Sequence, residues 1–531
     1  MDTTFDTVIK GGSIVDGTGQ PAFNADLGIS NGNIAAIGDL SSAEAASVIN
    51  AANLVVTPGF IDIHTHSDFT HLLDPRAESQ IRQGVTTEVI GQCGMSLAPC
   101  NPERFASLRR SVGRLDAAPW NSYAEYLAVL DDAATATNVV GVVGHGALRE
   151  VVMGLNKPGL ATDDEIAGMV SLLEECMEAG AFGLSTGLEY HPGKLAGFDE
   201  LVALCRVVSK ADGYYCTHSR NRDRRYFVGF GEAMDLARES AVRLQISHIN
   251  PKYGRPQHTM RNTLQMIEWA REEGIDVAMD VMATHWNFTA ATAQLPAWSF
   301  ALSEEELLDI MRTREGREKL KVNPLPMWQL VEEERWDKIK LMSCRSNTHL
   351  IGRTIDEIAK DNGSSGWDAL FDLLLEEGET CRAMTLTGDA FAEEDILRVL
   401  ENPLCAVASD TMALCNEGRL KGRQMGYHGY NWTTKYIVNY LRDEQVLSLE
   451  EGIRRITGLP AARVGLQDRG TLSKGAAADI AIFDLDSIRD NSSFAEPDVY
   501  ADGFEHIFVN GVLTFSRGER TAHHGGKILR H

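Results

Sequence analysis

Two histidines, His64 and His66, close the apolar run that extends from Thr57 to Ile63. In a β-strand, residues i and i+2 point to the same face, so these two imidazoles would project side by side as donors for one metal ion. A pair of hydrogen-bonded histidines at a strand end is the simpler alternative. The residues that end the other strand-like segments favour the metal site.

Five of the eight β-like segments in the central part of the chain end in a residue that can bind a metal. These residues are His64 with His66, then Cys93, His218, His248 and Asp410. The C-terminal ends of the strands of a β/α barrel meet at one face of the fold, so their side chains would converge there. The sequence therefore predicts one metal centre at the strand ends.

The donor types indicate which ion this centre would bind. Neutral imidazoles and a thiolate favour zinc over magnesium or calcium, which prefer oxygen ligands. Six candidate ligands exceed the four of one tetrahedral ion, which leaves two alternatives: a second ion that shares Cys93 as a bridge, or one ion with spare groups beside it. Asp410 is the residue best suited to accept a proton from the attacking water and to pass it to a leaving nitrogen.

Strand-like and helical segments alternate between the two ends of the chain, which predicts parallel strands with crossover helices. Eight strands suggest a closed (β/α)8 barrel of the TIM type. One helix is expected after the capping box Thr162 to Glu165, as far as Gly180, and another from Gln257 to Glu273. The expected strands are Gly59–His64, Thr86–Ile90, Val139–Gly144, Gly183–Thr186, Tyr214–Thr217, Arg243–Ser247, Asp276–Met282 and Cys405–Ser409.

The two chain ends share a different texture, in which short β-like segments alternate with turns such as Asn31-Gly32 and Asn510-Gly511. We expect them to pair into one small β-sandwich domain made of residues 1–57 and 464–531. The barrel would then occupy residues 58–463. The connection after the seventh strand is too long for one helix, so an insertion over about residues 285–345 is expected to cover the barrel mouth.

Composition limits the class of protein. The 531 residues are 44% hydrophobic, enough to bury a large core, and 75 acidic against 50 basic residues give a net charge of −25. This charge would repel nucleic acid and anionic membranes. No apolar run is long enough to span a bilayer, and nine cysteines without a CxxC pair fit reduced thiols, so a cytoplasmic enzyme is expected.

Several motifs together resemble those of the amidohydrolase superfamily, in its branch of N-acyl-D-amino-acid deacylases, or D-aminoacylases. The similarity covers nearly the full length of the chain. The motifs are Gly59–His66, Gln83–Thr87 with Cys93-Gly94, Gly183–Tyr190, Thr217–Asn221, Ser247-His248, Ala408–Asp410 and Gly470–Asp479.

The resemblance implies a role for each candidate ligand. Cys93, His218 and His248 would bind a tight zinc ion, and His64, His66, Cys93 and Asp410 would form a weaker second position. Asp410 would be the general acid and base. The resemblance also implies a distorted barrel with a small β domain from both termini. Many cyclic-amide relatives carry a carbamylated lysine at the end of strand four, and Cys93 would replace it here.

The residues expected to contact the substrate differ from the family pattern more than the metal ligands do. Tyr190 is retained, and Arg220 follows the histidine of strand five. Where the deacylases carry a carboxylate-binding lysine, this chain has Asn250, with Lys252 two residues further on. His285 lies in a replaced segment after strand seven, and His428 falls near the position of an expected arginine, with Arg419, Lys421 and Arg423 close by.

The sequence thus predicts a zinc-dependent amidohydrolase that cleaves a linear amide, with an N-acyl-D-amino acid or a close variant as its small-molecule substrate. One alternative is a hydrolase of a cyclic amide, a lactone or an N-formyl group on the same metal site. The other is a non-catalytic scaffold, which is disfavoured because every expected ligand position is filled.

Overall fold

The computed structural model describes residues 4–112, 115, 119–155, 157–323, 327–494 and 496–531. Its centre is a barrel of eight parallel strands, which confirms the expected fold class. The strands are β6 (Phe60–Asp62), β7 (Val85–Ile90), β8 (Asn138–Gly141) continued by β9 (Val143–Gly144), β10 (Gly183–Gly187), β11 (Tyr214–His218), β12 (Arg243–Ile246), β13 (Val277–Met282) and β17 (Cys405–Ala408).

The barrel is distorted, because its ladder of hydrogen bonds divides into two sheets. One sheet has the order β6-β7-β8 and the other β17-β13-β12-β11-β10-β9. A parallel bridge between Thr65 and Thr411 joins β6 to β17, and the amide of Val142 donates to the carbonyl of Ile90 on the other side. The first contact closes the ring between the first and last strands, and the second joins the second strand to the third.

Helices follow the strands along the chain, and their apolar sides pack with the strands in the main core. The capping box at Thr162 and Glu165 is present, and the helix that it opens ends two residues before Gly180. These helices are α1 (Thr70–Leu73), α2 (Glu78–Ile81), α3 (Pro102–Val112), α4 (Tyr123–Ala133), α5 (His145–Met153), α6 (Asp163–Glu178), α7 (Phe198–Lys210), α8 (Tyr226–Ser240), α9 (Thr259–Glu272), α15 (Glu393–Leu400), α16 (Trp432–Tyr436), α17 (Leu449–Arg455) and α18 (Gly458–Val464).

The chain between β13 and α15 folds around an apolar core of its own, which includes Trp328, Trp336 and Phe371. Its three-stranded sheet has the order β14-β16-β15. The segment expected as an insertion, about 285–345, contains the first and last of these strands but not the central one. The elements are β14 (Trp286–Ala290), α10 (Glu304–Met311), α11 (Arg314–Lys321), α12 (Gln329–Glu332), β15 (Ile339–Ser343), α13 (Ile355–Asn362), α14 (Gly366–Glu377) and β16 (Thr385–Asp389).

Both chain ends join one sheet of nine strands in the order β21-β20-β19-β18-β5-β1-β2-β3, with β4 paired to β1. Two expected hairpin turns have the positive φ that Asn-Gly favours, at Asn31 (φ 51°) and Asn510 (φ 49°). The strands are β1 (Phe5–Ile14), β2 (Phe23–Ser30), β3 (Asn33–Gly38), β4 (Ala45–Asn50), β5 (Val55–Pro58), β18 (Ile480–Phe483), β19 (Phe504–Val509), β20 (Val512–Ser516) and β21 (Glu519–Arg520).

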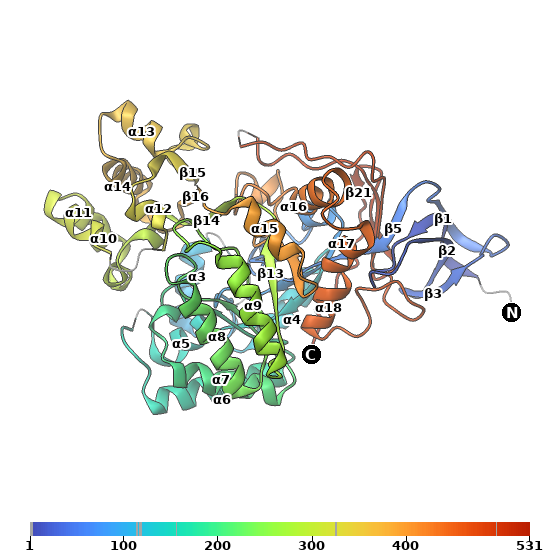
Figure 1. Ribbon diagram of the computed structural model, residues 1–531, viewed down its shortest axis with the longest axis horizontal. Helices are drawn as coiled ribbons and strands as arrows, with labels where there is room; N and C mark the ends of the chain where they lie inside the picture. The colour runs from blue at the N-terminus through green and yellow to red at the C-terminus, as the bar shows by residue number, and fades with distance from the viewer. Residues whose placement is uncertain (1–3, 113–114, 116–118, 156, 324–326, 495) are drawn as a thin grey trace.

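The molecule is elongated (Figure 1). The lobe that carries α10, α11, α13 and α14 projects at one end, and β1, β2 and β3 lie at the other, with the barrel helices between them. Within the described residues, every helix is too short or too polar to cross a lipid bilayer.

Candidate active site

All six residues predicted as metal ligands lie at the same end of the barrel. His218 is the last residue of β11, and the others follow the ends of β6, β7, β12 and β17 within a few positions. Three of them, Cys93 (φ 52°), His248 (φ 33°) and Asp410 (φ 51°), have a left-handed backbone. This conformation is unfavourable for residues other than glycine and is concentrated at functional sites. It turns the chain abruptly where each strand ends.

The candidate ligand atoms surround one point. Cys93 Sγ lies 3.3 Å from His64 Nε2, 3.3 Å from His248 Nε2 and 3.6 Å from His218 Nδ1. A tetrahedral zinc ion with ordinary bond lengths places a sulfur and a nitrogen ligand about 3.5 Å apart. His64, Cys93, His248 and Asp410 offer ligand atoms that all lie within 4.8 Å of one another. The donor set therefore fits a zinc ion in both chemistry and spacing.

Asp410 lies between the paired histidines of the first strand. Its Oδ1 is 3.1 Å from His66 Nε2 and 3.5 Å from His64 Nε2, and its Oδ2 is 4.0 Å from His248 Nε2. Burial raises the pKa of this carboxyl, but the neighbouring His64 and His66 outweigh burial and hold the pKa below its usual value. Asp410 is therefore an ionised acceptor at neutral pH.

Burial sets the charge of the other donors. It lowers the pKa of His64 to about 3 and that of His218 to about 4, so both imidazoles are neutral and keep a lone pair for a metal. Burial, reinforced by Asp410, raises the pKa of the Cys93 thiol. A cation at this point would supply the compensating charge that a buried thiolate needs.

Three further residues orient the ligands, and the sequence analysis did not identify them. Glu189 Oε2 lies 2.7 Å from His218 Nε2, the carboxylate–histidine arrangement that fixes a metal-binding ring. Asp280 Oδ1 accepts a hydrogen bond from the His248 amide at 2.6 Å. Arg222 Nη1 donates to the His248 carbonyl at 2.6 Å and lies 2.9 Å from His248 Nδ1. Glu189 stands within a motif already singled out, whereas nothing in the sequence marks Arg222 or Asp280.

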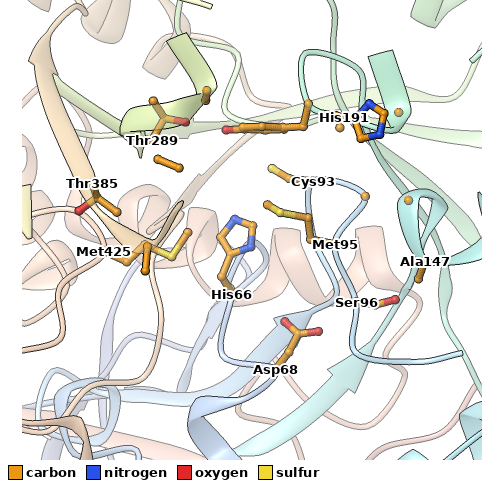
Figure 2. A pocket seen from close by; sticks show the side chains of 18 of the residues that line it. His66, Asp68, Cys93, Met95, Ser96, Ala147, His191, Thr289, Thr385 and Met425 are labelled. Carbon is orange, nitrogen blue, oxygen red and sulfur yellow. The ribbon is translucent and has the colours of Figure 1, made fainter. Parts of the chain in front are cut away.

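The cluster forms part of the wall of a cavity of about 570 Å³. Figure 2 shows His66 and Cys93 in its middle, with Met425 and Thr385 on one side and Ala147 and Ser96 on the other. Residues from the inserted lobe complete the wall, so the lobe contributes directly to the shape of the site. They are Phe288, Thr289, Ala290, Thr292, Ala293, Phe300, Ser343, Ala383 and Thr385.

Of the residues expected to contact substrate, Tyr190 lines this cavity, and its ring lies 4.7 Å from that of His218. Arg220, Lys252, His285 and His428 do not line it. Each of these four has a partner elsewhere. Arg220 pairs with Glu232, and Lys252 Nζ with Glu189 at 2.8 Å. His285 pairs with Glu393, and His428 Nε2 bonds to the Ser409 carbonyl at 2.6 Å. The expectation that they contact substrate is therefore not supported by their positions.

Comparisons with known proteins agree with this geometry. A model of the amidohydrolase family matches residues 47–515. The D-aminoacylase of Alcaligenes xylosoxydans xylosoxydans is 33% identical over 99% of this chain and 97% of its own length. The N-acyl-D-glutamate deacylase of the same organism is 30% identical over 100% of this chain and 97% of its own length.

Solved structures extend the comparison. N-acyl-D-glutamate deacylase from Bordetella bronchiseptica, complexed with zinc and a phosphonate inhibitor, matches with a TM-score of 0.82 and 29% identity over the whole of both chains. A crystal structure of D-aminoacylase matches with a TM-score of 0.81 and 29% identity over 99% of this chain and all of that one. These matches confirm the resemblance indicated by the motifs, and the chain belongs to the amidohydrolase family.

Proposed function

We propose that this amidohydrolase is a zinc-dependent deacylase that hydrolyses the linear amide of an N-acyl-D-amino acid or of a close variant. The observation that carries the proposal is the convergence of one thiol, three imidazoles and an ionised carboxylate on a single point in the cavity wall. The names of the similar proteins, D-aminoacylase and N-acyl-D-glutamate deacylase, support the choice of substrate class.

By the resemblance to the deacylases, Cys93, His218 and His248 would hold the tight zinc ion. Their positions are compatible with this, with His248 Nε2 at 3.3 Å and His218 Nδ1 at 3.6 Å from Cys93 Sγ. His64, His66 and Asp410, together with Cys93, would hold a weaker second ion. A study of D-aminoacylase describes activation by one metal and attenuation by a second in that protein. When bound, zinc would acidify water and polarise a carbonyl group as a Lewis acid.

The remaining chemistry belongs to residues of the chain. Asp410 Oδ1 would accept the proton of the attacking water and deliver it to the amide nitrogen, which makes the amine a tolerable leaving group. Burial raises the pKa of Tyr190, so its hydroxyl keeps its proton and can donate to the carbonyl oxygen as negative charge develops there.

A substrate panel tests the proposal. Zinc-loaded protein is incubated with the N-acetyl-D and N-acetyl-L forms of several amino acids, and release of free amine is measured against chelator-treated protein. We expect metal-dependent release from the D series. A second panel holds cyclic amides, lactones and N-formyl compounds, with hydrolysis followed by chromatography of the products. Metal-dependent hydrolysis confined to this second panel would contradict the substrate class while leaving the metal site intact.

A further inference from the structure

The cavity wall between Tyr190 and Lys194 carries two polar groups that have no partner among the described residues. Both nitrogens of His191 are buried without a hydrogen bond, and its ring stacks on Phe300 at a centroid distance of 6.0 Å and an angle of 9°. The Lys194 ammonium, half-buried on the same wall, forms neither a hydrogen bond nor an ion pair within the described part of the chain. Such groups are costly to bury unless a ligand satisfies them.

Two other charged groups on this side of the cavity already have partners. Arg104 Nε binds Glu150 at 2.7 Å, and its remaining nitrogens donate to the carbonyls of residues 96, 97 and 99. Glu189 accepts from Lys252 and contacts His218. Among the described residues, the Lys194 ammonium thus has no direct partner, whereas Arg104 and Glu189 on this side of the cavity are paired. Burial lowers the pKa of the Lys194 amine, although the negative charge of Glu189 acts in the opposite direction. The lowered pKa reflects the free-energy cost of burying the ammonium.

The position of these groups suits the amine side of the substrate. The Lys194 amide donates to the Tyr190 carbonyl at 2.7 Å, which places the two residues about one helical turn apart, and the Tyr190 ring touches that of His218. Figure 2 shows His191 on the side of the cavity that also holds Ala147 and Ser96. In an N-acyl amino acid the carboxylate lies only two bonds from the amide nitrogen. The carboxylate of a substrate whose amide lies at the metal ligands would therefore stay within the cavity that His191 and Lys194 line.

We propose that Lys194 and His191 form the subsite that binds the carboxylate of the substrate, an inference that rests on the proposed deacylase function. Lys252, which stands closest to the lysine position of the deacylases, cannot take this role while its ammonium is paired with Glu189 and with the Met327 carbonyl. Met95, Leu97 and Leu108 give the cavity apolar surface as well. An apolar amino-acid side chain suits it, so N-acetyl-D-leucine is the probe.

Kinetics on two probes that differ only in the carboxylate measure how much this group contributes to substrate binding. We expect the zinc-loaded enzyme to prefer N-acetyl-D-leucine over N-acetyl-D-leucinamide, which lacks the negative charge, by about ten- to a hundredfold in kcat/KM. Lys194→Met should abolish this preference by raising KM with little change in kcat, and Lys194→Arg should retain part of it. His191→Phe keeps the stacking on Phe300 and should reduce the preference to a lesser degree. Lys210→Met, at the exposed end of α7, is the control.

A binding measurement separates failure of this inference from failure of the proposed function. Calorimetry on Asp410→Asn protein measures the affinity for both probes without turnover. Tighter binding of the carboxylate, lost in the Asp410→Asn, Lys194→Met double variant, supports the subsite even if the enzyme hydrolyses neither probe. Equal affinity for both probes, or a preference that persists without the Lys194 ammonium, overturns it.

Discussion

At the scale of single residues, the site combines neutral nitrogen donors with one strongly ionised oxygen. Burial keeps the imidazoles of His64 and His218 uncharged. The neighbouring His64 and His66 hold the pKa of Asp410 below its usual value despite the burial of this carboxyl. All three pKa values are lowered, which leaves the imidazoles neutral for metal binding and the carboxylate charged for proton transfer. In the proposed mechanism, Asp410 therefore carries out the proton transfer.

Asp410→Asn tests this division. The amide is close to isosteric but cannot accept a proton, so we expect kcat to fall about a hundredfold or more, while the zinc bound to Cys93, His218 and His248 remains. Turnover and zinc content by elemental analysis are measured on the same preparation. Asp235→Asn, in an exposed ion pair on α8, is the matched control. Near-normal turnover in Asp410→Asn would remove the proposed mechanism.

Glu189→Gln tests whether the Glu189 carboxylate is needed to orient the His218 ring for metal binding. The substitution weakens the 2.7 Å contact to His218 Nε2 and leaves Lys252 without its counter-charge. We expect zinc affinity to fall about ten- to a hundredfold, measured by competition with a chelator. Glu232→Gln, which removes a half-exposed partner of Arg220, should leave the affinity unchanged. An unaltered affinity in Glu189→Gln would mean that His218 is held by packing alone.

At the scale of elements, the sequence predicted those features that depend on residues close together in the chain, such as the barrel strands and the residues that end them. Each barrel strand was visible because its run of apolar residues is bounded by turns, and Cys93 or Asp410 was visible because it ends such a run. The extent of the inserted lobe could not be predicted from local patterns. Its strand β14 pairs with β16 about a hundred residues later in the chain, and pairing at that distance leaves no local signal. Arg222 was missed for a similar reason, since a loop rather than a strand brings it to His248.

A prediction at this scale concerns the link between α5 and α7. Glu200 on α7 pairs with Arg149 at 2.6 Å and with His145 at 2.7 Å on α5, and all three are buried. Glu200→Gln leaves Arg149 without a counter-charge, so we expect the free energy of unfolding to fall by about 3 kcal/mol or more. Denaturant titration measures it, with the exposed Glu174→Gln as control.

The loss of unfolding free energy in Glu200→Gln should depend on pH in a defined direction. Burial raises the pKa of Glu200, but His145 and Arg149 outweigh it and hold the pKa below the usual value. A carboxyl with a depressed folded-state pKa contributes stability that is complete above its unfolded value and lost as the pH falls through the folded one. The gap in unfolding free energy between wild type and Glu200→Gln should therefore narrow below about pH 4.5. A gap that widens on acidification would contradict the assignment.

At the scale of the whole molecule, a buried carboxylate links the C-terminal strands to the barrel. Asp479, just before β18, accepts from Arg469 Nη1 at 2.5 Å and from the Asn510 amide at 2.6 Å. It also accepts from Asn138 Nδ2 of barrel strand β8 at 3.0 Å. One carboxylate thus connects the C-terminal strands, the helix-to-sheet connection and the barrel.

Asp479→Asn should consequently loosen the attachment of the C-terminal strands to the barrel. The buried Arg469 guanidinium keeps only its pair with the exposed Asp468, and an amide NH2 replaces an acceptor oxygen in front of donors that require one. We expect a cost of about 1 to 3 kcal/mol. We expect a lower melting temperature together with faster proteolytic cleavage between residues 464 and 531. Asp502→Asn removes the exposed pair with Arg489 and should cost below about 1 kcal/mol. If both variants melt alike, the chain ends are held by the apolar contacts of the sheet and not by this carboxylate.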